Sequence, residues 1–422
     1  MRANLRSDLR DGCVALLWDE SFLWGVMAYK ALRASGLAFE LIRAEDARNG
    51  ALAGYGTIFV PGGWAANKAN ALGKDGINAI RAFVDRGGNY IGFCGGAGLA
   101  TQDGIGLLPV TRRPTKERVP SFSGRIRLVS QDHDLWQGVG DPIFHAWWPS
   151  QFVVDECVKV IATYGEALPD SFTSDVNVGD GLSIGGWEDL EAVYQINLDP
   201  QRLIGEPALV EGKYGKGTVL LSLVHFDTPE DGNGAAVLGN MWRYFGCATN
   251  CQDAIELRPQ ARSGADPLSD SGMVDTQAAI DGLIGLGLRN FLWFWRNSML
   301  LQWRRGVRGL EYCTLSVLVH EVVTLLERGV DLSAMPGMVQ RIQRIRIMAQ
   351  PFAAKAGELL LRERRAMQKE HITYERCQDP KIVLLRDELF SRSKSYGGFF
   401  KELIDEIDHL LYQLLIGKRG TQ

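Results

Sequence analysis

The stretch that decides the fold is FVPGGWAANKANALGKDGINAIRAFVDRGGNYIGFCGGAGLAT, which covers residues 59–101. It begins with the end of a β-rich run that stops at Pro61-Gly62-Gly63. Apolar residues at helical spacing follow in residues 75–86, and Gly87-Gly88 ends that helix. Residues 89–93 form the next apolar run. A strand, a helix and a second strand in this order predict a parallel βαβ unit.

The second of these strands runs into Gly92-Phe93-Cys94-Gly95-Gly96, a turn of the form G-x-nucleophile-x-G. Such an elbow exposes a strained side chain and requires small neighbours. The helix that begins there would direct its dipole and free amides at the sulfur and favour the reactive thiolate. The sequence therefore predicts Cys94 as a nucleophile. The alternative is an inert buried cysteine in a glycine-rich turn.

Backbone amides near this elbow are candidates for an oxyanion hole. Gly95 follows the cysteine directly, and Gly62 and Gly63 end the neighbouring strand of the same predicted sheet. Glycine lets the backbone approach closely, so these amides can hold developing negative charge. The alternative for Gly62 and Gly63 is a plain turn after a strand.

The flanking sequence extends the same pattern. Residues 14–42 read as a further βαβ start, and residues 218–224 as a β-branched strand that ends at His225. Residues 107–209 hold short strand-like pieces joined by turns, which predict antiparallel edge strands and long loops. We therefore expect a flavodoxin-like α/β domain over residues 1–251, with a parallel sheet covered by helices on both faces.

His225 is the best-placed base for a cysteine nucleophile. It follows directly on a predicted strand, and Asp227 two residues later can orient its ring. The alternative is a hydrogen-bonded histidine at a strand end. His133 and His145 fall in the loop-rich middle, where they are candidates to line the cleft. His320, His371 and His409 fall in the second half of the chain.

The quoted run resembles the class I glutamine amidotransferase-like superfamily, and most closely the amino-terminal domain of biotin-protein ligases. A PGG turn, a G-x-x-x-I-x-x-F-V helix, a GG-x-Y strand and a G-x-C-x-G elbow come in the order and spacing of that group. The similarity extends over residues 13–246. It implies that Cys94 is the nucleophile and His225 the base, with Asp227 where the H-P-E motif has its glutamate. Glu230 offers a second acid, since His225-Phe226-Asp227 departs from H-P-E.

The sequence also departs from that family in its substrate contacts and its domains. Glutamine-hydrolysing members have a glutamine four residues after the cysteine, where this chain has Gly98. No ammonia-accepting domain accompanies the site, and no G-R-G-R-x-G-like adenylate loop is present. These departures argue against glutamine as the substrate and against a biotin ligase.

The second half of the chain has a different character. Residues 252–274 have the Pro, Gly, Ser and Asp content of a linker, and residues 275–422 read as an all-α helical bundle. Helices are expected over residues 276–304, 309–328, 338–371, 381–390 and 399–416. The aromatic-rich residues 283–303 suit a central bundle helix or, alternatively, an amphipathic helix at a membrane surface.

Composition limits the possible partners. Residues 1–251 carry 22 Lys and Arg against 29 Asp and Glu, and the rest carry 24 against 21, so neither half is charged enough to predict nucleic-acid binding. Seven scattered cysteines and a polar amino terminus predict a cytoplasmic protein without a disulfide framework or a metal site. Neither a cofactor nor a membrane span is expected.

These observations predict a cysteine-dependent, amidotransferase-like hydrolase that acts on a C–N (amide) bond of a small, unidentified substrate. The alternative is a catalytically inactive amidotransferase-like binding or scaffold module whose helical domain recruits a protein partner.

Overall fold

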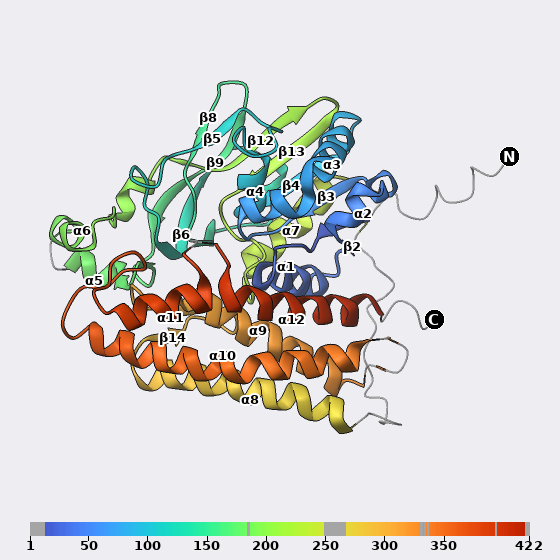
Figure 1. The fold of residues 1–422 in the computed structure, drawn as a ribbon. Coiled ribbons are helices and arrows are strands. Elements are labelled where there is room, and N and C mark those ends of the chain that lie inside the picture. The colour runs from blue at the N-terminus through green and yellow to red at the C-terminus, as the bar shows by residue number, and fades with distance from the viewer. Residues whose placement is uncertain are drawn as a thin grey trace. The chain divides into compact units, whose positions relative to one another are not determined.

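The computed structural model describes residues 13–183, 186–248, 267–329, 332, 335, 337–392 and 395–417. The chain divides into two compact units, Met1–Ala254 and Ile255–Gln422. The first unit is built on a large sheet, and helices dominate the second (Figure 1). Of the predicted linker, residues 252–266 lie outside the described residues, and a helix already begins at Pro267.

The strands of the first unit lie mainly in one mixed sheet. Its strands are β1 (Val14–Leu17), β2 (Phe39–Ile42), β3 (Thr57–Val60), β4 (Asn89–Phe93), β6 (Phe122–Ser130), β7 (Ile143–Trp147), β9 (Lys159–Ala167), β10 (Phe172–Thr173), β11 (Val176–Asn177), β12 (Pro207–Tyr214) and β13 (Gly217–Ser222). A separate pair joins β5 (Val110–Arg112) to β8 (Phe152–Val154). The strand order in the large sheet is β11-β10-β6-β9-β12-β13-β4-β3-β1-β2, and β7 pairs with β6.

The parallel half of the sheet confirms the predicted flavodoxin-like fold. Its order β2-β1-β3-β4-β13 is the 2-1-3-4-5 order of that fold, with neighbouring strands parallel. Its strands are apolar and buried on both faces, as at Phe59, Ile91 and Leu220. Because all five strands run the same way, their carboxyl ends share one edge. The antiparallel strands β12, β9 and β6 extend the sheet beyond β13.

Helices cover both faces of the parallel half. The longer ones are α1 (Leu23–Ala34) and α7 (Gly232–Tyr244) on one face and α3 (Ala65–Asp85) with the short α4 (Gly95–Ala100) on the other (Figure 1). The remaining elements are short: α2 (Ala44–Arg48), η1 (Ala51–Gly54), η2 (Asp134–Trp136), α5 (Val178–Ser183), α6 (Glu188–Tyr194) and η3 (Pro200–Leu203).

The second unit packs long helices against one another. Its elements are α8 (Pro267–Arg289), β14 (Trp293–Trp295), β15 (Leu301–Trp303), α9 (Gly309–Glu327), α10 (Met338–Ala366), α11 (Pro380–Phe390) and α12 (Gly398–Gly417). Helix α9 contacts α8 and α12. Among the described helices, α9 has the length and hydropathy to cross a membrane, but 72% of that apolar window is buried inside the protein. Burial of this kind characterises the central helix of a bundle.

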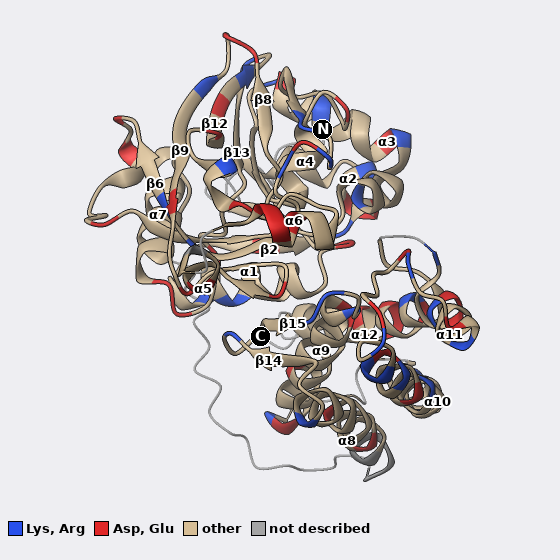
Figure 2. Cartoon of the chain, turned by 90° about the vertical axis from the view of Figure 1, so that its left-hand side faces the viewer, with Lys and Arg blue, Asp and Glu red and all other residues tan. Residues whose placement is uncertain are grey.

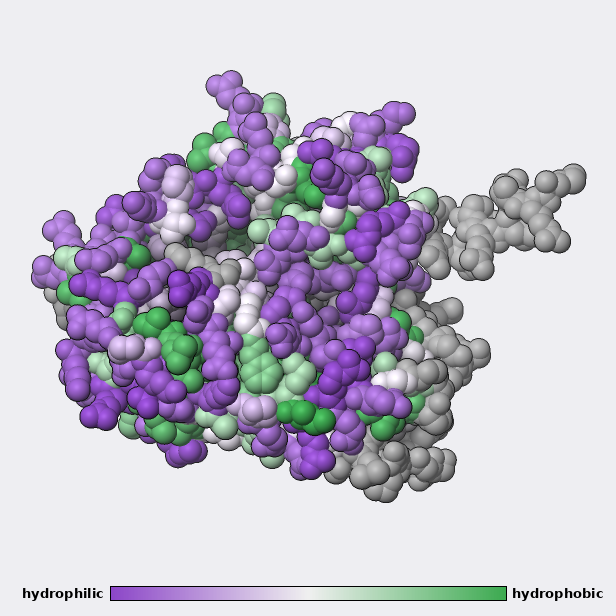
Figure 3. All heavy atoms as spheres, viewed as in Figure 1, coloured by the Kyte–Doolittle hydropathy of each residue, from purple (hydrophilic) through white to green (hydrophobic). Residues whose placement is uncertain are grey.

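The surface of these helices is polar and of mixed charge. Basic and acidic residues are interspersed along α10 and α11 (Figure 2). The face of the molecule in Figure 3 is mostly hydrophilic, with separate small hydrophobic patches. Such dispersed apolar groups are ordinary on a protein surface.

The single helix predicted over residues 276–304 is wrong in its second half. Helix α8 ends at Arg289, Phe291 takes a φ of 56°, and β14 pairs with β15 as an antiparallel hairpin. The side-chain oxygen of Asn297 accepts hydrogen bonds from the amides of Met299 and Leu300, both at 2.8 Å, and so closes the turn. Asparagine turn chemistry and the β propensity of tryptophan outweigh the helical spacing of the apolar residues.

Candidate active site

Cys94 lies between the end of β4 and the first turn of α4. Its φ of 47° and ψ of −103° are unusual for a residue with a side chain, as expected of a nucleophile elbow. The Cys94 amide donates to the carbonyl of Ser222 on β13 at 2.8 Å, and the amide of Gly98 donates to the Cys94 carbonyl at 2.8 Å. These two hydrogen bonds hold the strained residue in place.

The glycines of the elbow are required by close backbone packing. A Cβ on Gly95 would lie 1.8 Å from the carbonyl oxygen of Gly63, and one on Gly96 would lie 1.9 Å from that of Val60. The Pro61-Gly62-Gly63 turn therefore touches the start of α4, as the sequence predicts. The amides of Gly62 and Gly63 donate no hydrogen bond to any described residue, which leaves them available to a ligand.

A buried lysine, which sequence reasoning missed, supports this turn. Lys68 of α3 has no exposed surface, and its ammonium donates to Ser21 Oγ at 2.5 Å and to the carbonyl of Asp19 at 3.2 Å. Its Cε would lie 3.2 Å from a Cβ on Gly63. A lysine one turn into a helix reads as surface, so no sequence signal pointed to it.

His225 follows β13 and lies at the same edge of the sheet as Cys94. The ring is fully buried, and its Nδ1 lies 2.9 Å from Oδ1 of Asp227, which is also fully buried. This contact leaves Nε2 as the ring nitrogen available to the cysteine. Nε2 has no partner of regular hydrogen-bond geometry among the described residues. Glu230, the other candidate acid, is exposed.

The electrostatics of His225 favour its protonated form. Burial lowers its pKa, but the charge of Asp227, the hydrogen bond to that residue and the nearby Cys94 side chain outweigh burial and raise the pKa to about 9. Cys94 and His225 thus lie close enough to interact electrostatically without sharing a regular hydrogen bond.

Two tryptophans complete the surroundings of His225, and neither was expected from the sequence. The ring of Trp24 stacks on His225 with centroids 4.6 Å apart, and Trp148 packs edge-on against Trp24 at 6.3 Å. Trp24 lies in the first turn of α1, the helix that follows β1, so it lies at the edge where the strands end.

The remaining histidines have partners elsewhere. The ring of His133 lies 3.2 Å from Glu211, and that of His145 lies 2.9 Å from Asp231. The backbone of His145 still touches the site, because its carbonyl accepts the amide of His225 at 2.8 Å. In the second unit, His320 of α9 pairs with Asp281 at 3.4 Å, His371 follows α10, and His409 lies on α12.

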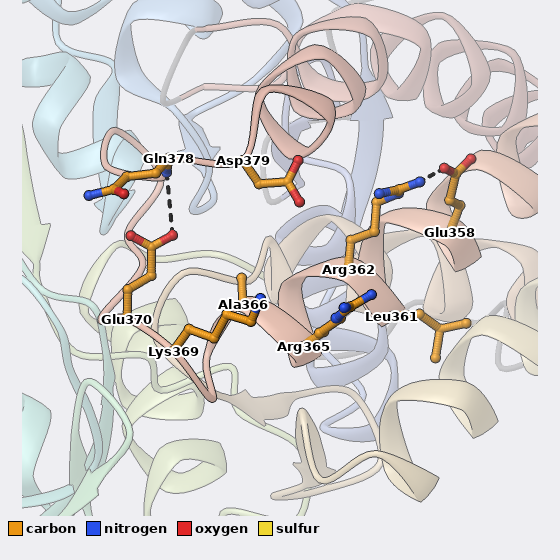
Figure 4. Close-up of a pocket in the computed structure, with 9 residues that line it drawn as sticks. All are labelled: Glu358, Leu361, Arg362, Arg365, Ala366, Lys369, Glu370, Gln378 and Asp379. Atoms are coloured by element: carbon orange, nitrogen blue, oxygen red, sulfur yellow. Dashed lines mark hydrogen bonds and ion pairs between the residues drawn. The ribbon is translucent and has the colours of Figure 1, made fainter.

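Other candidate sites within the described residues are few. The described residues contain no cluster of three or more His, Cys, Asp or Glu side chains that could hold a metal ion. The described cysteines are all free thiols. A cavity of about 870 Å³ lies near the end of α10 in the second unit, and charged side chains line much of it (Figure 4). Two hydrogen bonds join residues that line this cavity: Arg362 donates to Glu358, and the backbone amide of Gln378 donates to Glu370.

The comparisons with known proteins agree with the resemblance read from the sequence. Residues 53–103 match the family described as biotin-protein ligase, N terminal. The matched segment includes the Pro61-Gly62-Gly63 turn and the elbow but not His225. No curated protein matches the chain.

Several solved structures are similar to the chain at low identity. PurLQS of Thermotoga maritima is 16% identical, covers 56% of this chain and 99% of its own, and has a TM-score of 0.38. A putative GMP synthase component of Thermoplasma acidophilum is 10% identical, covers 56% and 96%, and has a TM-score of 0.36. A putative ThuA-like protein of Bacteroides uniformis is 12% identical, covers 58% and 95%, and has a TM-score of 0.36.

Proposed function

We propose that the first unit is a cysteine-dependent hydrolase that cleaves a C–N bond of a small amide. The observation that carries the proposal is the juxtaposition of Cys94, strained at the start of a helix, with a buried His225 whose ring is held by Asp227. Catalytic cysteines require this combination of an activated thiolate, an imidazole and a group that orients the imidazole.

The proposed reaction follows from these positions. The Cys94 thiolate attacks the amide carbon, and the amides of Gly63 and Gly95 hold the oxyanion that forms. His225 then donates its Nε2 proton to the departing amine or ammonia, which leaves a thioester on Cys94. The neutral imidazole next takes a proton from water, whose oxygen attacks the thioester and releases the acid.

Selective alkylation of Cys94 tests the activated thiol. We expect iodoacetamide to modify Cys94 at neutral pH faster than the exposed Cys157 and faster than N-acetylcysteine amide in solution, as followed by mass spectrometry. His225→Ala should remove this advantage. Equal rates at Cys94 and at the reference thiols would contradict the proposal and favour an inactive binding module.

Turnover is tested by ammonia release from a panel of small amides. Cys94→Ser should abolish the release, whereas Cys157→Ser, on an exposed loop, should leave it unchanged. A panel without any hydrolysed amide, combined with a reactive Cys94, would indicate a thiol site that acts on a different bond.

A further inference from the structure

An arginine side chain occupies the space beside the residue that departs from the family pattern. Gly98 lies one helical turn after Cys94 on α4. A Cβ at this position would lie 3.1 Å from Nη1 and 3.6 Å from Cζ of Arg112, which belongs to β5. The guanidinium group therefore lies against the face of the helix from which a side chain at position 98 would project.

A second arginine lies within electrostatic range of the first. Arg118 is half-buried, its Nη1 donates to Ser150 Oγ at 2.6 Å, and its Nε is buried without a partner. Burial lowers the pKa of Arg118, the positive charge of Arg112 lowers it further, and Cys94 raises it. The pKa of Arg118 therefore responds to the charges of both Arg112 and Cys94.

Neither arginine has an acidic partner among the described residues. Arg113, between them in the sequence, forms two hydrogen bonds with Glu206 at 2.9 and 3.0 Å. The side chain of Arg112 makes no hydrogen bond or ion pair within the described part of the chain, and the guanidinium of Arg118 donates only to hydroxyl groups. Two like charges held together, one of them partly desolvated, cost free energy that a bound anion would offset.

We propose that Arg112 and Arg118 form an anion subsite beside Cys94, so that the substrate is an amide that also carries a carboxylate or phosphate group. This inference rests on the proposed hydrolase. Glycine at position 98 leaves room for the guanidinium of Arg112, and guanidinium groups bind oxyacid anions through paired N–H donors.

Alkylation by two reagents of similar size and different charge tests the subsite. We expect the ratio of the iodoacetate rate to the iodoacetamide rate at Cys94 to exceed that of N-acetylcysteine amide by about tenfold, the low end of electrostatic focusing in a cleft. Arg112→Gln and Arg118→Met should each bring the ratio toward that of the free thiol. Arg112 is exposed, so its substitution leaves the core intact.

Arg86→Gln is the matched control, because it removes the same charge from an exposed position beside the start of β4, at the opposite edge of the sheet. It should leave the ratio at Cys94 unchanged. Slowing of the iodoacetate reaction by propionate or by inorganic phosphate at equal ionic strength then identifies which anion the subsite holds.

A ratio at Cys94 equal to that of the free thiol, or one unaffected by both arginine variants, would overturn the anion subsite. Failure of the proposed hydrolase is a separate outcome. If iodoacetamide modifies Cys94 no faster than the reference thiols, the hydrolase proposal fails, but the ratio of the iodoacetate rate to the iodoacetamide rate still tests the anion subsite.

Discussion

Strain at a single residue distinguishes Cys94 from the other cysteines. A residue with a side chain at a positive φ outside the common regions costs about 1–3 kcal/mol and persists only when its surroundings hold it. At Cys94 those surroundings are the hydrogen bonds to Ser222 and from Gly98 and the contact of α4 with the Pro61-Gly62-Gly63 turn. The strain directs the side chain away from the backbone of β4.

Asp227 and Glu230 are the two acids that the sequence offered as partners of His225, and the structure distinguishes them. We expect Asp227→Asn to lower amide hydrolysis by about 10²-fold or more, because the imidazole loses the charge that keeps it protonated and oriented. Glu230→Gln should change the rate by less than about twofold, since Glu230 is exposed. Initial rates of ammonia release measure both variants. A larger loss in Glu230→Gln would reassign the third member.

The raised pKa of His225 predicts how stability depends on pH. The folded protein holds the proton up to about pH 9, whereas an unfolded histidine releases it near its ordinary pKa of 6.5. The contribution is complete below pH 6.5 and is lost as the pH rises through 9; one pKa unit corresponds to about 1.4 kcal/mol. Hydrogen exchange of peptides from β13, corrected for intrinsic rates, should show this loss in wild type. Asp227→Asn should flatten it, and an unchanged slope would contradict the assignment.

At the scale of elements, helix α4 can pack against the turn after β3 only because position 96 is a glycine. Gly96→Ala should destabilise the first unit by about 3 kcal/mol or more, because its methyl group would clash with the Val60 carbonyl and move α4 away from the turn. Gly239→Ala on α7 is the matched control. Its new Cβ meets nothing within 4 Å, so it should be neutral or stabilise by up to about 1 kcal/mol. Urea unfolding compares the two, and equal effects would refute the packing argument.

Elements of the second unit are tied together by a buried ion pair. Arg386 of α11 contacts Glu363 of α10 at 2.7 Å, and its other nitrogens donate to the carbonyls of Thr373 and Gly306. Burial raises the pKa of Glu363 to about 7, although Arg386 opposes that shift. The pair therefore joins two helices and two connecting segments in one desolvated cluster.

Removal of Arg386 should test that cluster. We expect Arg386→Met to destabilise the second unit by about 3–5 kcal/mol at pH 8, because Glu363 loses its partner and must either stay buried as an unpaired charge or bind a proton. The loss should shrink near pH 6, where Glu363 binds a proton. Arg362→Met removes an exposed pair with Glu358 on the same helix and should cost less than about 0.5 kcal/mol. Thermal unfolding measures both variants, and similar losses would disprove the importance of burial.

At the scale of the whole molecule, the strand order of the sheet brings the residues of the candidate site together. Cys94 and His225 are far apart in the chain, yet they follow the neighbouring parallel strands β4 and β13, whose register pairs Phe93 with Ser222. The second unit has its own core. Its role as a docking domain for a protein partner remains a prediction from the sequence.

Local signals were enough to predict the parallel fold, the elbow at Cys94 and the position of His225, because strand periodicity and glycine turns depend on residues that are close together in the sequence. Contacts between distant segments were beyond such signals. Only the tertiary structure shows that Lys68 is buried behind the turn, that Trp24 stacks on His225, and that Asp227 contacts the His225 ring. It also turned residues 293–303 into a hairpin and placed Arg112 against Gly98. These features depend on which surfaces meet when the chain folds, and helical or strand spacing along the sequence does not encode that.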